Sequence, residues 1–197
     1  MHCVGIGEED FIRGKVPITK KEIRILALAQ ARIAPDALVA DVGAGTGSLT
    51  IEAALLAPRG KVYALERSPE ALALIAANAE KFGANNVTII PGEAPATMGA
   101  LPPCDAVFVG GSGGKLAEIL GVAMEKLKPT GRLVALCITL QSLTGCFAFL
   151  RSRAYLAHEA VQVQVNRLAE TGGYDMMQAQ NPIWLITMWK SNKPPNL

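Results

Sequence analysis

The chain has 197 residues, 50% apolar and 18% charged, and this composition indicates a globular domain with a large core. The 19 basic and 17 acidic residues give a formal net charge of +2 without a dense basic run, which counts against a nucleic-acid partner. The four cysteines show no Cys-x-x-Cys spacing and there are two histidines, so the sequence predicts no metal site.

The start of the chain lacks a basic region followed by an apolar core, and no apolar run approaches the roughly 20 residues that span a bilayer. We therefore expect a cytoplasmic protein without a membrane segment. Residues 1–18 lack periodicity and contain several glycines, which predicts an irregular N-terminal arm. Thr19 is the predicted cap of a helix from Lys20 to about Ile33, with Glu22 completing a capping box. Its predicted apolar face is formed by Ile23, Leu26, Ala27 and Ala31.

A glycine-rich turn follows the apolar run Leu38 to Val42 and leads into a second helix that ends near Ala57. Glycines at 43, 45 and 47 allow the backbone to approach a ligand closely. The spacing is not that of a dinucleotide loop, and Asp41 would repel a diphosphate. An acid at this position suits a cationic ligand.

The order acid, x, Gly, x, Gly, x, Gly resembles the first motif of the class I methyltransferases, whose cofactor is S-adenosylmethionine. In that family the turn passes over the methionine part of the cofactor, and an acid at the end of the second strand takes both ribose hydroxyls. Here that strand is Lys61 to Glu66. The alternative is a glycine-rich turn beside a solvated Glu66.

The next segments continue the alternation of strands and helices. Ser68 and Pro69 have the form of a helix start, Gly83 is the predicted stop, and Val87 to Ile90 is a third strand. This alternation predicts a parallel, doubly wound sheet. By resemblance, Gly92-Glu93-Ala94 lies beside the adenine, with Ala94 as a backbone contact; an ordinary loop is the alternative.

The second half of the chain completes a Rossmann-like α/β fold of the class I methyltransferase type, with a seven-stranded, mostly parallel sheet and an antiparallel last strand. The expected elements are a strand at 105–109, a helix at 115–126, a strand at 133–138, a helix at 143–153, and strands at 159–168 and 183–189. A loop with Gly172 and Gly173 is expected between the last two strands, which should pair at the sheet edge. We expect one domain at 19–190 and a loose tail at 191–197.

A second glycine turn, Gly110 to Gly114, follows the strand that neighbours the first strand in this architecture. Gly110, Gly111 and Ser112 should therefore lie next to the donor methyl group, on the substrate side. The alternative is a tight turn that needs glycine for a positive φ.

Several stretches together resemble the cobalt-precorrin-6B carbon-15 methyltransferase (decarboxylating), or precorrin-8w decarboxylase, family of cobalamin biosynthesis. They are 9–20, 41–47, 92–95, 109–114 and Asn181-Pro182. The resemblance implies a precorrin substrate, a homotetramer, and cofactor contacts from Thr19, Asp41, Gly43, Ala44, Gly45, Thr46, Gly47, Glu66, Glu93 and Ala94. Related sequences usually have Glu where Ala96 stands, and many have Asp at the position of Glu66.

Catalytic residues are not identified by the sequence, because an electron-rich ring carbon needs positioning more than a protein base. A substrate with many carboxylates needs cations, and the candidates are Arg13, Lys15, Lys20, Arg24 and Lys115, each of which is alternatively a solvated surface charge. Competing functions are a methyltransferase of another small molecule or of RNA, a nicotinamide-dependent dehydrogenase, and a non-enzymatic nucleotide-binding module. Asp41 counts against the last two, and the low aromatic content of 5% counts against RNA.

Overall fold

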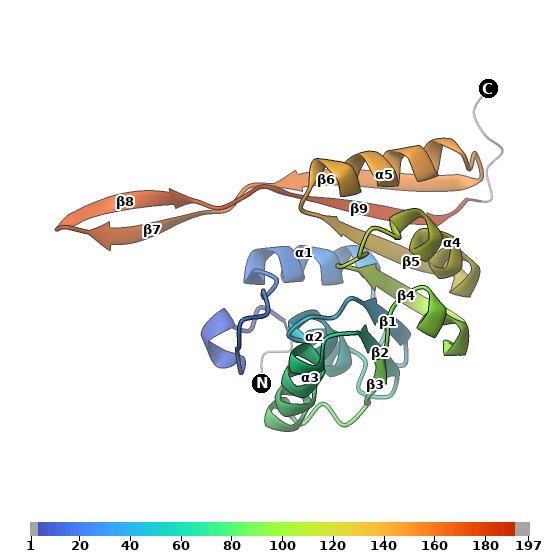
Figure 1. Ribbon diagram of the computed structural model, residues 1–197, viewed down its shortest axis with the longest axis horizontal. Coiled ribbons are helices and arrows are strands. Elements are labelled where there is room, and N and C mark those ends of the chain that lie inside the picture. The colour runs from blue at the N-terminus through green and yellow to red at the C-terminus, as the bar shows by residue number, and fades with distance from the viewer. Residues whose placement is uncertain (1–3, 192–197) are drawn as a thin grey trace.

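The computed structural model describes residues 4–191 and contains a seven-stranded sheet with helices on both faces (Figure 1). The strand order is β3-β2-β1-β4-β5-β9-β6, and β9 runs antiparallel to its neighbours β5 and β6 while the other pairs are parallel. The strands are β1 (Leu38–Val42), β2 (Lys61–Glu66), β3 (Val87–Pro91), β4 (Cys104–Val109), β5 (Leu127–Cys137), β6 (Leu156–Val163) and β9 (Ile183–Lys190). The predicted fold class is confirmed.

In the described part of the chain, five α-helices cover the sheet, in two layers that each have an apolar core. On one face lie α1 (Lys21–Ala31), α2 (Ser48–Leu56) and α3 (Pro69–Phe82), and on the other lie α4 (Leu116–Lys126) and α5 (Leu140–Arg151). Short 3-10 helices occur at Glu8–Asp10 and Ala96–Ala100. Within residues 4–191, no helix is both long and apolar enough to span a membrane.

The two ends of α3 follow the local sequence signals. The Ser68 hydroxyl accepts a hydrogen bond from the Ala71 amide, Pro69 opens the helix, and Gly83 ends it with a φ of +65°. These predictions are confirmed.

The start of α1 differs from the prediction. Lys20, not Thr19, occupies the N-cap position without a side-chain cap, so the predicted capping box does not form. The Thr19 carbonyl instead accepts a hydrogen bond from the Arg24 guanidinium. Leu26, expected on the apolar face, is 38% exposed, whereas Arg24 is fully buried. Arg24 is buried because it forms an ion pair with Glu52, which the apolar pattern of the helix did not predict.

The region between α5 and β9 also differs from the prediction. The expected strand 159–168 is divided between β6 and β7 (Asn166–Thr171), and β7 pairs with β8 (Tyr174–Ala179) in a separate two-stranded ribbon that extends from the body (Figure 1). Gly172 and Gly173 form its turn, with φ of +61° and +81°. The predicted pairing of the last two sheet strands is confirmed as β6 with β9.

The residues around β5 and α5 need smaller corrections. The strand expected at 133–138 begins earlier, since residues 128–132 belong to a β5 that begins at Leu127 and has an irregular register with β4. Helix α5 begins three residues before the expected start, because Thr139 and Ser142 form a capping box.

The cores draw on the whole chain. Phe11 of the N-terminal arm is only 4% exposed and packs in the same core as α1 and α2. Cys104, Cys137 and Cys146 are buried free thiols. Cys3 and most of the predicted tail, 192–197, lie outside the described residues.

Candidate functional site

The first glycine turn connects β1 to α2 at the carboxyl edge of the parallel strands. The amides of Gly43 and Ala44 donate to the Leu65 carbonyl at the end of β2, at 2.9 and 3.2 Å. Gly43 has a φ of +74°, and a Cβ there would lie 2.6 Å from the Gly111 nitrogen. The two glycine turns therefore approach backbone to backbone, which only glycine at position 43 permits.

Glu66 lies beside this turn, as predicted, because β2 pairs in parallel with β1. Its Oε2 accepts a hydrogen bond from the Gly45 amide at 3.0 Å, and its Oε1 accepts from the amides of Arg67 and Ser68 at 2.8 and 2.9 Å. A carboxylate has about four acceptor sites, so this one is held in a fixed orientation with a site left for a ligand.

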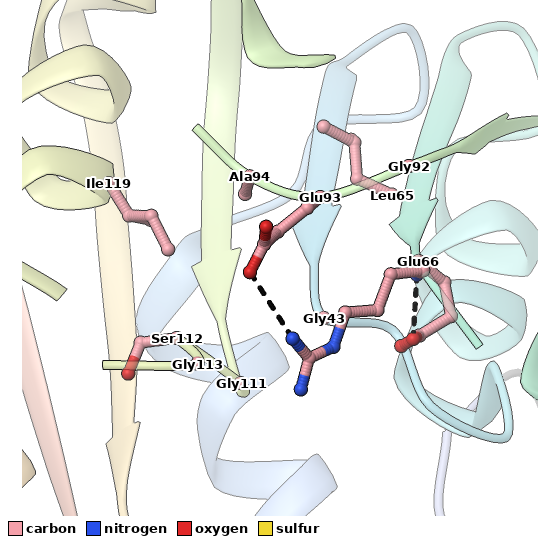
Figure 2. A pocket seen from close by; sticks show the side chains of 11 residues that line it. Gly43, Leu65, Glu66, Gly92, Glu93, Ala94, Gly111, Ser112, Gly113 and Ile119 are labelled. Carbon is pink, nitrogen blue, oxygen red and sulfur yellow. Dashed lines mark hydrogen bonds and ion pairs between the residues drawn. The ribbon is translucent and has the colours of Figure 1, made fainter. Parts of the chain in front are cut away.

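A first cavity, of about 130 Å³, opens beside Glu66 (Figure 2). Its lining comes mainly from the four turns that follow the parallel strands β1, β2, β3 and β4, as expected for α/β sheets. The lining residues are Gly43, Leu65, Glu66, Arg67, Gly92, Glu93, Ala94, Gly111, Ser112, Gly113 and Ile119. The structure thus brings together the predicted contacts Gly43, Glu66, Glu93 and Ala94, and two of the substrate-side candidates, Gly111 and Ser112.

Glu93 joins two of these turns through exposed ion pairs. Its Oε1 lies 3.2 Å from the Arg67 guanidinium and its Oε2 lies 3.1 Å from the Lys115 ammonium. The dashed line from Glu93 in Figure 2 marks its ion pair with Arg67. The hydrogen bond from Lys115, with the charge of that residue, lowers the pKa of the Glu93 carboxyl. The pairs are exposed to solvent, and they add little stability.

A second cavity, of about 410 Å³, shares Gly43 and Gly111 with the first. It is lined by the end of the N-terminal arm, both glycine turns, the end of β5 and the start of β9. The residues are Val16, Pro17, Ile18, Thr19, Lys20, Gly43, Ala44, Gly45, Thr46, Gly110, Gly111, Leu136, Ile138, Asn181 and Ile183. Four further predicted contacts, Thr19, Ala44, Gly45 and Thr46, lie here, with Gly110.

Two of the predicted cofactor contacts line neither cavity. Asp41 is 2% exposed, and its Oδ2 accepts a hydrogen bond from the Thr50 hydroxyl at 2.6 Å. Burial raises the pKa of Asp41 to about 6. Gly47 is covered by α3, since a Cβ there would lie 3.0 Å from Ile75 Cγ1. Asp41 and Gly47 are therefore not placed to contact a ligand directly in this structure.

The five cations proposed for the substrate do not gather in one place. Arg24 is wholly buried in an ion pair with Glu52 at 3.0 Å and also donates to the carbonyls of Thr19 and Ile6, so its expected role as a surface cation was wrong. Lys115 pairs with Glu93 at the mouth of the first cavity. Arg13 and Lys15 are exposed and line neither cavity, whereas Lys20 lines the second.

Asn78 is a positioning residue that the sequence did not indicate. Its buried amide accepts a hydrogen bond from the Ile12 nitrogen at 2.8 Å and donates to the Ile12 and Thr46 carbonyls at 3.1 and 3.0 Å. It therefore connects the N-terminal arm directly to the first glycine turn. A single Asn in a helix carries no local signal for such a role.

The described residues contain no group of three or more His, Cys, Asp or Glu side chains arranged to hold a metal ion. The polar groups of the site are instead backbone amides, the fixed carboxylate of Glu66 and the ion pairs of Glu93. Such a site can hold and orient a nucleoside-containing ligand with few side-chain acids or bases at the reacting atoms.

Comparison with known families and proteins gives consistent matches. Residues 10–193 match the model of the precorrin methyltransferase domain. The cobalt-precorrin-6B C(15)-methyltransferase (decarboxylating) of Salmonella typhimurium is 41% identical over 184 residues, which cover 93% of this chain and 95% of that protein. A probable enzyme of the same name from Sulfolobus acidocaldarius is 42% identical, covering 94% and 97%.

Solved structures agree with these matches. The precorrin-6Y C5,15-methyltransferase of Geobacter metallireducens is 39% identical with a TM-score of 0.90, covering 96% of this chain and 98% of that one. The precorrin-8w decarboxylase of Methanobacterium thermoautotrophicum is 34% identical with a TM-score of 0.85, covering 92% and 98%. An O-methyltransferase of Thermotoga maritima and a tRNA methyltransferase of Aquifex aeolicus, at 18% and 19% identity, share the fold.

Proposed function

Because this chain belongs to the precorrin methyltransferase family, we propose that it methylates carbon 15 of cobalt-precorrin-6B and removes the carboxyl group of an acetate arm in cobalamin biosynthesis. The single observation that carries this is the match to decarboxylating relatives at about 41% identity along nearly the whole chain. Family membership confirms the expectation of a methyltransferase with S-adenosylmethionine as methyl donor.

In the proposed complex, the cofactor extends from the first cavity into the second across Gly43 and Gly111. The adenine lies beside Glu93 and Ala94, the ribose binds Glu66, and the methionine part follows Gly43 to Thr46 and Thr19. Support comes from the three amides that fix the Glu66 carboxylate and from the lining of both cavities by these residues. The buried Asp41 contributes charge from beneath the turn and does not touch the ligand.

The chemistry that this geometry supports is transfer by positioning. When bound, the cofactor would supply an electrophilic methyl group to an electron-rich ring carbon of the substrate, and its sulfur would keep the electron pair of the broken bond. In the decarboxylation, the bond between the arm carbon and the carboxyl carbon breaks, carbon dioxide leaves, and the electron pair enters the conjugated ring. A proton from solvent then completes the new methyl group. Neither step requires a metal or a protein nucleophile.

The test is incubation of the purified chain with cobalt-precorrin-6B and S-adenosylmethionine, followed by mass spectrometry of the corrinoid. The expected product has gained a methyl group and lost carbon dioxide. A corrinoid recovered unchanged with active cofactor present would contradict the proposal. The metal-free corrinoid, assayed in parallel, shows which form is preferred.

We also propose that the chain forms a homotetramer through the β7–β8 ribbon. The ribbon extends from the body, and Leu168 and Met177, partners across its two strands, are 70% and 80% exposed (Figure 1). Exposed apolar side chains on a projecting element are typical of association surfaces. Light scattering should give a smaller mass for Met177→Asp than for wild type, with Gln178→Asp on the same strand as the control. Cytoplasmic location and the lack of a nucleic-acid partner stay predictions.

A further inference from the structure

The second cavity has an uneven distribution of charge. Its walls are apolar along the arm and the ends of β5 and β9, where Ile18, Leu136, Ile138 and Ile183 lie. Among the described residues that line it, Lys20 is the one with a charged side chain. A substrate with many carboxylates therefore meets a single cation in this cavity.

The ammonium group of Lys20 is held only loosely. In the described chain its recorded partner is the Asn181 carbonyl, at 3.4 Å, and no carboxylate pairs with it. An ammonium has three hydrogen-bond donors, so at least two are available to a ligand.

The position of Lys20 is fixed by its surroundings. Arg24, one turn along α1, donates a hydrogen bond from its side chain to the carbonyl of the neighbouring Thr19. Arg167 of β7 pairs with Glu8 and Glu22 at 3.2 and 3.0 Å, which ties the ribbon base to the arm and α1. The two walls that carry Lys20 and Asn181 are thus held together, and the backbone of Lys20 has a defined place at the cavity.

We propose that Lys20 binds a retained carboxylate arm of the substrate and so sets the orientation of the macrocycle, while the arm that loses carbon dioxide lies against the apolar wall. This inference rests on the proposed function. A cation beside the departing carboxylate would stabilise it and oppose decarboxylation, whereas an apolar surface disfavours the charged group and favours its loss. Lys20 is therefore a specificity residue and not a catalytic one.

The test uses Lys20→Met, which removes the charge and keeps most of the length, Lys20→Arg, which keeps the charge, and Lys21→Met as a neighbouring control that lies outside the cavity. KM for cobalt-precorrin-6B, kcat and the Kd of S-adenosylmethionine are measured for each. We expect Lys20→Met to raise KM about 10- to 100-fold, the range for a lost charged hydrogen bond, with kcat and cofactor Kd nearly unchanged. Lys20→Arg and Lys21→Met should keep KM near that of wild type.

Salt supplies a second readout, since KM of wild type should rise with ionic strength and that of Lys20→Met should rise less. Equal KM values for Lys20→Met and Lys21→Met would overturn the proposal. A parallel loss of cofactor affinity in Lys20→Met would also overturn it, because it would show a structural role for the arm.

The wild-type assay distinguishes failure of the proposed function from failure of the carboxylate-binding role of Lys20, called the anchor below. Turnover by wild type with an unchanged KM in Lys20→Met rejects the anchor and leaves the proposed function intact. No turnover by wild type rejects the proposed function, and the anchor is then judged by fluorescence titration of the same variants with uroporphyrin, a tetrapyrrole with eight carboxylates. Equal binding by wild type and Lys20→Met, or binding by neither, would reject the anchor.

Discussion

The two cavities that share Gly43 and Gly111 are built from different parts of the chain and differ in polarity. The first is lined by turns after β1, β2, β3 and β4, and it carries the ionic side chains of Glu66, Arg67 and Glu93. The second adds the N-terminal arm and the ends of β5 and β9 to the glycine turns, and its walls are mostly apolar with Lys20 as its charged lining residue.

This difference agrees with the proposal that the nucleoside part of the cofactor lies in the first cavity and that the macrocycle meets the apolar walls of the second. Fixed carboxylates and backbone amides suit the hydroxyls and amino groups of a nucleoside, whereas apolar walls suit a large flat macrocycle. The first cavity uses elements that any doubly wound sheet provides at this edge. The second needs the arm, so its shape depends on contacts far apart in the sequence. Changes to the arm should therefore affect ligand binding in the second cavity more than in the first.

The largest expected effect comes from Arg24, which holds the arm but lines neither cavity. Arg24→Met leaves the buried Glu52 carboxylate without its ionic partner and should lower the free energy of unfolding by about 3 to 5 kcal/mol. Urea denaturation measures this, with the exposed Arg13→Met as control. Turnover should fall while adenosine still binds. Equal losses of adenosine binding and turnover would contradict this difference, because they would show that the first cavity depends on the arm as much as the second does.

Asp41 lies beneath the boundary of the two cavities, and burial raises its pKa from 3.8 to about 6. Between these values the folded state binds more protons than the unfolded state, so stability falls as pH rises through this range. The full loss, present above about pH 6, is about 3 kcal/mol.

Asp41→Asn should remove this pH dependence and be more stable than wild type at pH 8, because an amide oxygen can still accept from Thr50. Urea denaturation at pH 4.5 and pH 8 measures both effects. A raised pKa of Asp41 would be rejected if the stability of wild type, but not that of Asp41→Asn, rose between pH 4.5 and pH 8. If Asp41 attracts the cofactor cation, the variant should also lose part of any preference for S-adenosylmethionine over its demethylated product.

Gly111 tests the boundary itself. Its φ lies outside the left-handed range, and a Cβ would meet Gly43 Cα at an ordinary 3.8 Å, so the backbone accepts a side chain here. Gly111→Leu should melt near the wild-type temperature but lower kcat/KM about 100-fold by displacing the reacting groups. Gly113→Leu is the contrasting variant. Gly113 has a φ of +54°, which leucine adopts only with strain, so this substitution should destabilise the turn. Normal turnover by folded Gly111→Leu would remove this turn from the substrate side.

The smallest expected effect is confined to the first cavity. Glu66→Ala should weaken S-adenosylmethionine binding by about 1.5 to 3 kcal/mol, through loss of a hydrogen bond to a charged group. Calorimetric titration measures the affinity, with Glu70→Ala, an exposed acid at the start of α3, as control. KM for the corrinoid at saturating cofactor should stay within about 2-fold, since Glu66 does not line the second cavity. Unchanged cofactor affinity would exclude Glu66 from the site.

The sequence by itself determined the first cavity. The apolar run before Gly43, the spacing to Glu66 and the caps at Ser68 and Gly83 are local patterns, and each has one favoured backbone solution. Since parallel β1 and β2 bring their carboxyl ends together, the turn and Glu66 had to meet. The fold class followed from the same alternation of strands and helices.

Only the tertiary structure decided the second cavity and the ribbon. The burial of Arg24 depends on Glu52, which is 28 residues away, and that of Asn78 depends on Ile12 and Thr46. Period-2 alternation predicts a strand but not its partner, so the run through Val165 did not reveal that β6 joins the sheet while β7 leaves it. Long-range pairing is fixed by the summed packing of distant segments, and no window of the sequence contains that information.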